Sequence, residues 1–121
     1  GPLSSTTDGS ADGLEVSYNR FAQMLEATTL QVHVSIDGAA DTLRLWLSQS
    51  YLDSTRIESI SPEPASIEVA EGRLIFNFEL AAPVQETDIV FHLNPELPGL
   101  KQGAIGVEGG SSVELSQFVY P

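Results

Sequence analysis

Two histidines, His33 and His92, are the first candidates for chemistry in this sequence. Each lies between apolar neighbours, in LQVHVSID (30–37) and DIVFHLN (88–94), so each should project from a strand on the face opposite to those neighbours. If the two strands faced each other, the pair and a nearby carboxylate would form a metal site. Nothing in the sequence brings the two histidines together, and ordinary strand histidines are the alternative interpretation.

Two aspartates and the serines offer weaker chemistry. Asp37 and Asp41 bracket a predicted turn and could hold Ca²⁺ through their oxygens, but the D-x-[DN]-x-[DN]-G pattern is missing, so a solvated turn is the alternative. A serine hydrolase of the elbow type needs G-x-S-x-G, which does not occur. The chain also has no cysteine, which excludes disulfides, thiolate zinc sites and cysteine nucleophiles. We therefore expect no enzymatic activity, no metal and no cofactor.

The glycine-rich segment GAIGVEGGSS (103–112) resembles a phosphate loop only in composition. A phosphate loop follows a strand and opens a helix, whose amide groups meet the anion. Here a strand-like segment, VELSQFVY, follows instead, GK[ST] is absent, and Glu108 would repel a phosphate. The pair Gly109-Gly110 suits a hairpin turn that needs positive φ, so we expect the chain to turn there.

A surface patch for a partner or a ligand is the remaining candidate site. Trp46 lies opposite the leucines of its strand and beside Arg44, and Tyr51 follows in the next loop. Outward packing would make these three residues a sugar platform or a protein-binding patch. Alternatively, Trp46 is the buried tryptophan often found in immunoglobulin-like sandwiches. Both faces of this strand are partly apolar, so the alternation does not decide which face is buried.

The charge balance excludes one class of partner. The chain of 121 residues carries 17 acidic and 5 basic residues, for a net charge of −12. Nucleic-acid binding needs clustered bases that neutralise phosphates, and the same reasoning disfavours an anionic membrane surface. The acidity is interpreted as a contribution to solubility. The bases are instead scattered along the chain: Arg20, Arg44, Arg56, Arg73 and Lys101.

The elements that must position these side chains are strands. Apolar residues recur with a period of two, and turn signals recur every 8 to 12 residues. This pattern predicts an all-β domain, an immunoglobulin-like antiparallel β-sandwich of seven to nine strands. The predicted strands are 14–18, 30–37, 42–48, 56–60, 66–69, 73–80, 88–94, 104–108 and 112–120.

Local exceptions to this pattern give further predictions. Asp37-Gly38 and Ala70-Glu71-Gly72 are expected to be turns. Residues 18–27 have helical spacing and are a weak helix candidate, and residues 48–54 should be a loop with one helical turn. In the last strand Val113 and Leu115 are out of phase with Phe118 and Tyr120, so a bulge near Ser116-Gln117 is expected to restore the alternation.

The domain is expected to begin at Leu14. Gly1-Pro2 is interpreted as the scar of a cleaved tag, and residues 3–13, LSSTTDGSADG, as a flexible linker. Residues 14–121 then form a single domain. No apolar stretch is long enough to span a bilayer, so any membrane anchor would lie in a removed N-terminal part.

Residues 44–64, RLWLSQSYLDSTRIESISPEP, and 107–121, VEGGSSVELSQFVYP, carry a resemblance to a group of small bacterial proteins. Those proteins look like one N-terminal membrane helix, a short polar linker and a single extracytoplasmic β-sandwich. The resemblance covers residues 14–121 and implies an anchored domain outside the cytoplasmic membrane. The group has no assigned activity, so the resemblance assigns no functional residue.

The sequence thus leads to two functional hypotheses. The first is a non-enzymatic interaction domain at the extracytoplasmic face of a bacterial cytoplasmic membrane, whose partner is a membrane or envelope protein. The alternative is a ligand-binding module for carbohydrate or a divalent cation. In both, the candidate patch is Arg44, Trp46 and Tyr51, and the oligomeric state is undetermined.

Overall fold

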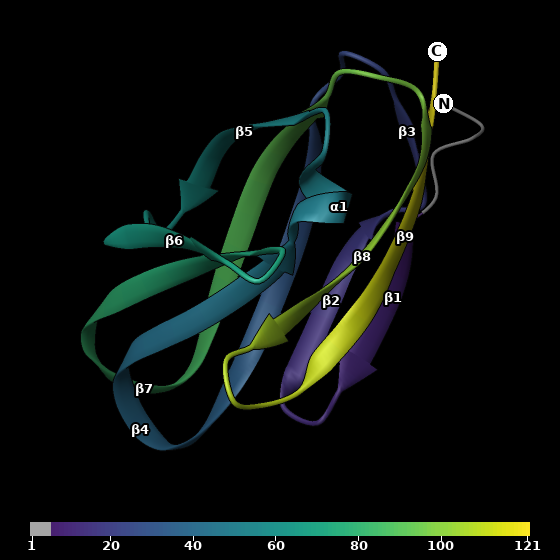
Figure 1. The fold of residues 1–121 in the computed structure, drawn as a ribbon. Helices are drawn as coiled ribbons and strands as arrows, with labels where there is room; N and C mark the ends of the chain where they lie inside the picture. Colours follow the sequence, from purple (N-terminus) through teal and green to yellow (C-terminus); the bar gives the residue numbers. More distant parts are fainter. Residues whose placement is uncertain (1–5) are drawn as a thin grey trace.

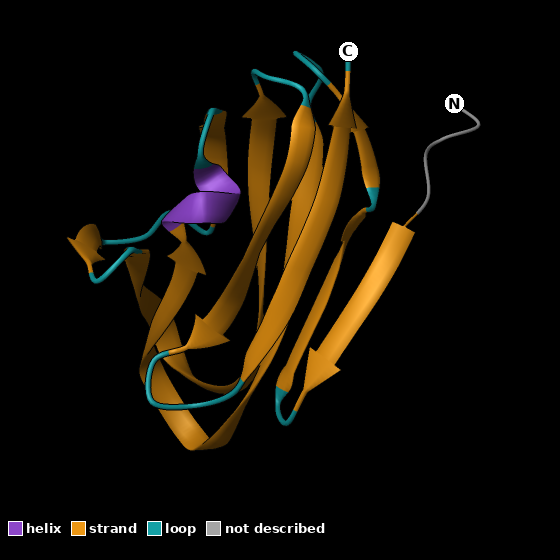
Figure 2. Cartoon of the chain, turned by 45° about the vertical axis from the view of Figure 1, so that its right-hand side comes forward, coloured by secondary structure: helices purple, strands orange, loops and turns teal. Residues whose placement is uncertain are grey.

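The computed structural model describes residues 6–121, apart from the side chain of Asp37, and is built almost entirely of strands (Figures 1 and 2). The all-β prediction is therefore confirmed. Most strand pairs are antiparallel, and the strands form one curled sheet with the shape of a half-barrel. The elements are β1 (Thr6–Ala11), β2 (Leu14–Asn19), β3 (Phe21–Gln23), β4 (Thr28–Ser48), α1 (Gln49–Leu52), β5 (Thr55–Ser61), β6 (Ser66–Ala70), β7 (Arg73–Pro95), β8 (Gly99–Val107) and β9 (Ser112–Tyr120).

The two long strands, β4 and β7, determine the curl of the sheet. Residues 30–34 of β4 lie between β2 and the second half of β7, whereas residues 45–47 lie between the first half of β7 and β8. The register shifts on both sides of Ala40, which is the mark of bulges in both strands. Each strand therefore bends and runs through both halves of the sheet, as Figure 1 shows.

The predicted turn at Asp37-Gly38 is wrong, and the bend explains why. Gly38 does have a positive φ of 70°, as a turn glycine would. However, the chain does not reverse there, because β4 continues through this point and keeps β7 as its partner on both sides. Likewise, the segments 73–80 and 88–94 are not two strands but parts of β7.

The core lies on the concave side of the curled sheet and joins both halves. Phe76 from the first half of β7 and Phe91 from the second are fully buried and meet edge to face, with ring centroids 5.1 Å apart. Tyr51 of α1 is also buried in this cluster. The other buried members come from β2, β4, β5, β7, β8 and β9: Leu14, Val16, Tyr18, Leu30, Val32, Val34, Leu43, Leu45, Leu47, Ile60, Phe78, Ile89, Leu93, Ile105, Val113 and Leu115.

Two predicted hairpins are confirmed. Ala70 pairs with Arg73 around a two-residue turn in which Glu71 and Gly72 have φ of 53° and 76°. Two consecutive positive φ angles are typical of the turn that matches strand twist. The glycine-rich segment also turns: Gly109 has φ of 75°, and β8 and β9 pair on either side of it.

Two predictions about the less regular segments are corrected and one is confirmed. Thr6–Ala11, within the predicted linker, form β1, because Gly9 lets this strand lie against Val113 of β9, where a Cβ atom would come within 2.5 Å. Residues 18–27 form no helix, since Phe21–Gln23 pair with β9 as β3. The single helical turn expected within residues 48–54 is confirmed as α1. In the part of the chain that the structure describes, no helix has the length and apolar character needed to cross a bilayer.

The bulge expected in the last strand is also absent. β9 alternates without interruption from Val113 to Val119 and keeps an unbroken register with β8. The buried position after Leu115 is taken by Gln117, whose amide donates a hydrogen bond of 2.7 Å to the carbonyl of Asn19. Because this polar side chain is satisfied inside, the alternation holds and Phe118 faces outward, with 43% of its surface exposed.

Candidate functional site

Trp46, the centre of the predicted patch, lies on the convex face of the sheet but is covered. Only 8% of its surface is exposed. Its ring lies directly on Gly106 of β8, where a Cβ atom would be within 2.5 Å of the ring. The guanidinium of Arg73 covers the ring from the other side, 4.0 Å from its centroid, in a cation–π contact.

The other two predicted residues lie on opposite sides of the sheet. Arg44 is on the convex face with Trp46, where its Nε donates to Asn77 at 2.9 Å and its Nη2 to Glu68 at 3.0 Å. Tyr51 is 1% exposed and belongs to the core, and burial raises the pKa of its hydroxyl far above the usual range. Of the three, Arg44 alone is exposed, so a partner would reach the predicted patch mainly through Arg44.

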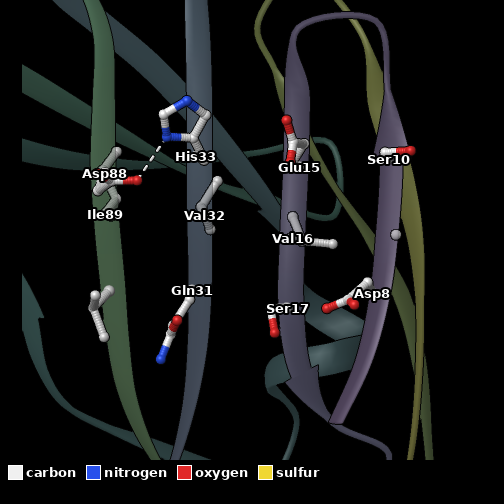
Figure 3. A pocket seen from close by; sticks show the side chains of 12 residues that line it. Asp8, Ser10, Glu15, Val16, Ser17, Gln31, Val32, His33, Asp88 and Ile89 are labelled. Atoms are coloured by element: carbon white, nitrogen blue, oxygen red, sulfur yellow. Dashed lines mark hydrogen bonds and ion pairs between the residues drawn. The ribbon is translucent and has the colours of Figure 1, made fainter.

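A polar groove crosses the convex face of the other half of the sheet (Figure 3). The groove has a volume of about 490 Å³. Its lining side chains form two rows across β1, β2, β4 and β7, which the strand register sets side by side. The two rows are Ser10, Glu15, His33 and Asp88, and Asp8, Ser17, Gln31 and Val90.

His33 is held at this groove by two carboxylates. Its Nδ1 lies 2.7 Å from Oδ1 of Asp88, and its Nε2 lies 3.1 Å from Oε1 of Glu86. An ionised carboxylate only accepts hydrogen bonds, so both contacts are hydrogen bonds when the ring is protonated and both of its nitrogens donate. The hydrogen bond to Asp88, and secondly that to Glu86, raises the pKa of His33 above 6.5. In its protonated form, His33 has no lone pair for a metal or a substrate proton, and it forms an ionic link between β4 and β7.

We expect the pKa of His33, measured by NMR titration of its ring protons, to fall in Asp88→Asn and, by a smaller amount, in Glu86→Gln. The raised pKa means that the stabilisation by this link is fully present below pH 6.5 and is lost as the pH rises through the folded-state pKa. A pKa that stays the same in both variants would show that the two carboxylates do not bind the ring in solution.

The geometry does not bring together the two histidines of the predicted metal site. His33 faces Asp88 across the β4–β7 pair, whereas His92 faces Thr29, which lies four positions before His33 in β4. Asp41 is exposed, and the side chain of Asp37 lies outside the described part of the chain. Among the described residues, no group of three histidine, aspartate or glutamate side chains is arranged to hold a metal ion.

Exposed apolar side chains gather at one end of the sheet, which the sequence did not predict. Leu100 of β8 and Phe118 of β9 are cross-strand neighbours, 60% and 43% exposed. The β3–β4 connection presents Leu25, 62% exposed, and the β7–β8 connection presents Leu97, 57% exposed. A hydrogen bond of 2.7 Å from the amide of Leu25 to the carbonyl of Pro95 joins the two connections. We call these four leucine and phenylalanine side chains the end patch.

The end patch lies where the first described strand begins and the last one ends. Thr6 pairs with Asn19 just before β3, and Phe21 pairs with Phe118. Figure 1 shows the β3–β4 and β7–β8 connections at the same end as the C-terminus. The sequence held one signal for this surface: strict alternation from Val113 and Leu115 turns Phe118 outward. The predicted bulge would have buried Phe118 instead.

No protein-family model matches this chain, and no curated protein sequence matches it either.

Proposed function

We propose that this chain is a non-enzymatic interaction domain that binds another protein through the end patch. The main observation behind this proposal is that four large apolar side chains, each at least 43% exposed, gather at one end of a strongly charged molecule. Isolated exposed leucines are common, but a group of them bordered by polar residues marks an interaction site. The border here is acidic, since Glu26 follows Leu25 and Glu96 precedes Leu97.

The partner in this proposal is a membrane or envelope protein, and the domain works at the extracytoplasmic face of a bacterial cytoplasmic membrane. The resemblance of residues 44–64 and 107–121 to small anchored bacterial proteins supports this location. Protease accessibility of the full-length protein in spheroplasts tests it. Protection of the domain until the cytoplasmic membrane is broken would contradict the location without affecting the end patch.

Site-specific photocrosslinking in the bacterium that makes the protein tests the interaction. A photoreactive phenylalanine at Leu97 or Leu100 should capture one and the same envelope protein, because both positions lie in the end patch. The matched controls are Ser112 and Glu114, which are exposed on β9 but lie outside the patch. Capture of the same proteins at patch and control positions would refute a specific surface.

The proposal also includes the fold family of the domain. We infer an immunoglobulin-like sandwich whose two layers are the two halves of the curled sheet. Two features support it. All strand pairs of the described residues except β3–β9 are antiparallel, and both halves of the sheet contribute to one core. An experimental structure that shows a continuous barrel wall instead would overturn this assignment.

The alternative, a ligand-binding module, is favoured by the groove beside His33. The groove offers carboxylate, hydroxyl and amide groups from three strands, including Asp8, Ser17 and Gln31. Such groups suit a carbohydrate, or a divalent cation that keeps part of its water shell. A thermal melt with oligosaccharides and divalent cations distinguishes the alternatives, since a ligand at about 100 times its Kd adds about 2.7 kcal/mol of stability.

A further inference from the structure

We propose that the free edge of β6 is a second binding site, which accepts an extended peptide segment of another protein as an added strand. The segment has apolar residues at alternate positions and basic residues between them. This site is separate from the end patch and does not depend on it.

The backbone of β6 is available for such pairing. Among the described residues, β6 pairs with β7 alone, and all five of its residues are exposed. Figure 1 shows β6 at the margin of the sheet. Ala70 and Arg73 flank the two-residue turn and form the first hydrogen-bonded pair, and hydrogen-bonded and non-hydrogen-bonded pairs then alternate along the hairpin. The N–H and C=O groups of Ile67 and Val69 therefore point away from β7, toward the free edge.

The side chains of Ile67 and Val69 are the exposed ends of two apolar rows that run across the sheet. One row runs across the sheet through Leu45 and Phe76, which are fully buried, to Ile67, which is 49% exposed. The next row runs through Leu47 and Leu74 to Val69, which is 66% exposed. A strand added beside β6 would continue the backbone ladder and cover both rows, if its own apolar residues alternate.

A hollow also opens near the β6–β7 turn, with Gly72 of that turn in its lining. It has a volume of about 610 Å³ and lies between α1, β5 and the β6–β7 turn. Its apolar lining includes Leu52, Ile57 and Leu74, and Leu74 is the cross-strand neighbour of Val69.

The net negative charge of the chain favours a basic partner. Residues 56–73 contain four carboxylates and two arginines, and two of the carboxylates already pair with arginines, Glu58 with Arg56 and Glu68 with Arg44. Because the whole chain has a net charge of −12, a basic segment is attracted to it, whereas a second copy of this chain is repelled. The Glu68 side chain on β6 already binds Arg44 and Asn77 on the convex face. The carboxylates are Glu58, Glu63, Glu68 and Glu71.

Titration of the ¹⁵N-labelled protein with a capped peptide of alternating lysine and valine, seven residues long, tests the proposal. We expect the amide signals of Ile67 and Val69 to shift and to gain protection from hydrogen exchange. Binding should weaken at least tenfold for a peptide of the same composition with its valines in one block, and for a glutamate–valine peptide. Shifts spread evenly over the acidic surface, or equal binding of the three peptides, would overturn it.

Val69→Pro is the matched variant, because it removes only the outward N–H and leaves the bonds to β7 in place. It should reduce binding at least tenfold while the β7 amide signals stay unchanged. If Val69→Pro disturbs β7, the double variant Ile67→Thr/Val69→Thr takes its place, with the same expected loss. Unchanged binding by that double variant would refute the site, as would a dimer that forms through Val69.

The double variant Leu100→Ser/Phe118→Ser separates this site from the end patch. It should bind the lysine–valine peptide as the unmodified protein does. A loss of peptide binding in this variant would assign the peptide to the end patch and overturn the proposed edge site.

Discussion

Replacing Phe76 by alanine should lower the free energy of unfolding by about 3–5 kcal/mol, the range for large buried aromatic side chains. For a domain of this length that corresponds to a fall in Tm of roughly 12–20 °C. Phe76 is fully buried and meets Phe91 edge to face, so the variant loses apolar burial and an aromatic contact, and leaves a cavity where the two halves of β7 approach each other. Denaturant unfolding followed by circular dichroism measures the change.

Phe118→Ala is the control for this prediction. It removes the same atoms from the end patch, where 43% of the side chain is exposed, and should cost about 1 kcal/mol or less. Equal losses in the two variants would mean that Phe76 does not hold the halves of the sheet together as the structure shows.

Replacing Gly106 by alanine should destabilise the domain by about 1–3 kcal/mol, as overpacking does. The new methyl group would lie 2.5–2.7 Å from three atoms of the Trp46 ring, closer than any contact permits. The ring cannot remain on β8 and must move outward against Arg73, which covers it. Because Trp46 is the single tryptophan, its fluorescence reports the movement: blue emission in the unmodified protein and red-shifted emission in Gly106→Ala.

Two further variants test this interpretation. Gly110→Ala adds the same methyl group in the β8–β9 turn, where the nearest atom is 3.4 Å away, and should change stability by about 0.5 kcal/mol or less. Trp46→Leu removes the colliding ring, so the double variant with Gly106→Ala should be more stable than the sum of the single effects predicts. Strict additivity would show that the cost of Gly106→Ala arises elsewhere.

Features that depend on a few neighbouring residues were predictable from the sequence. The alternation in 42–48 and 73–80 predicted strands, and Glu71-Gly72 and Gly109-Gly110 predicted the hairpin turns that the structure contains. The single helical turn at Gln49–Leu52 was predictable as well. These signals act over two to four residues, through side-chain direction and positive φ, so no knowledge of the partner strand is needed.

Several individual errors arose where a partner strand overrides the local pattern. Gly38 has turn geometry, yet β4 continues because β7 pairs with it on both sides of the bend. Phe118 was expected to be buried, but the hydrogen bond from Gln117 to Asn19 makes a polar inward residue acceptable. Residues 6–11 have a linker-like composition, yet they pair with β2 along their length.

The candidate surfaces depend on register even more strongly. Trp46 belongs to a strand with apolar residues on both faces, and only the position of Gly106 and Arg73 decides that its ring is covered on the convex face. His33 and Asp88 are 55 positions apart in the sequence and meet because the β4–β7 register places them opposite each other. A shift of one residue would turn every side chain of a strand to the other face, and local sequence does not specify that register.

The sequence by itself determined an all-β, acidic domain without cysteine chemistry, together with the places where its hairpins turn. Those properties follow from composition and from short-range backbone preferences. The tertiary structure decided how the long strands bend, which aromatic side chains are covered, and that the end patch and the edge of β6 stay open. These follow from the pairing of distant strands, whose register fixes the face and the neighbours of each side chain.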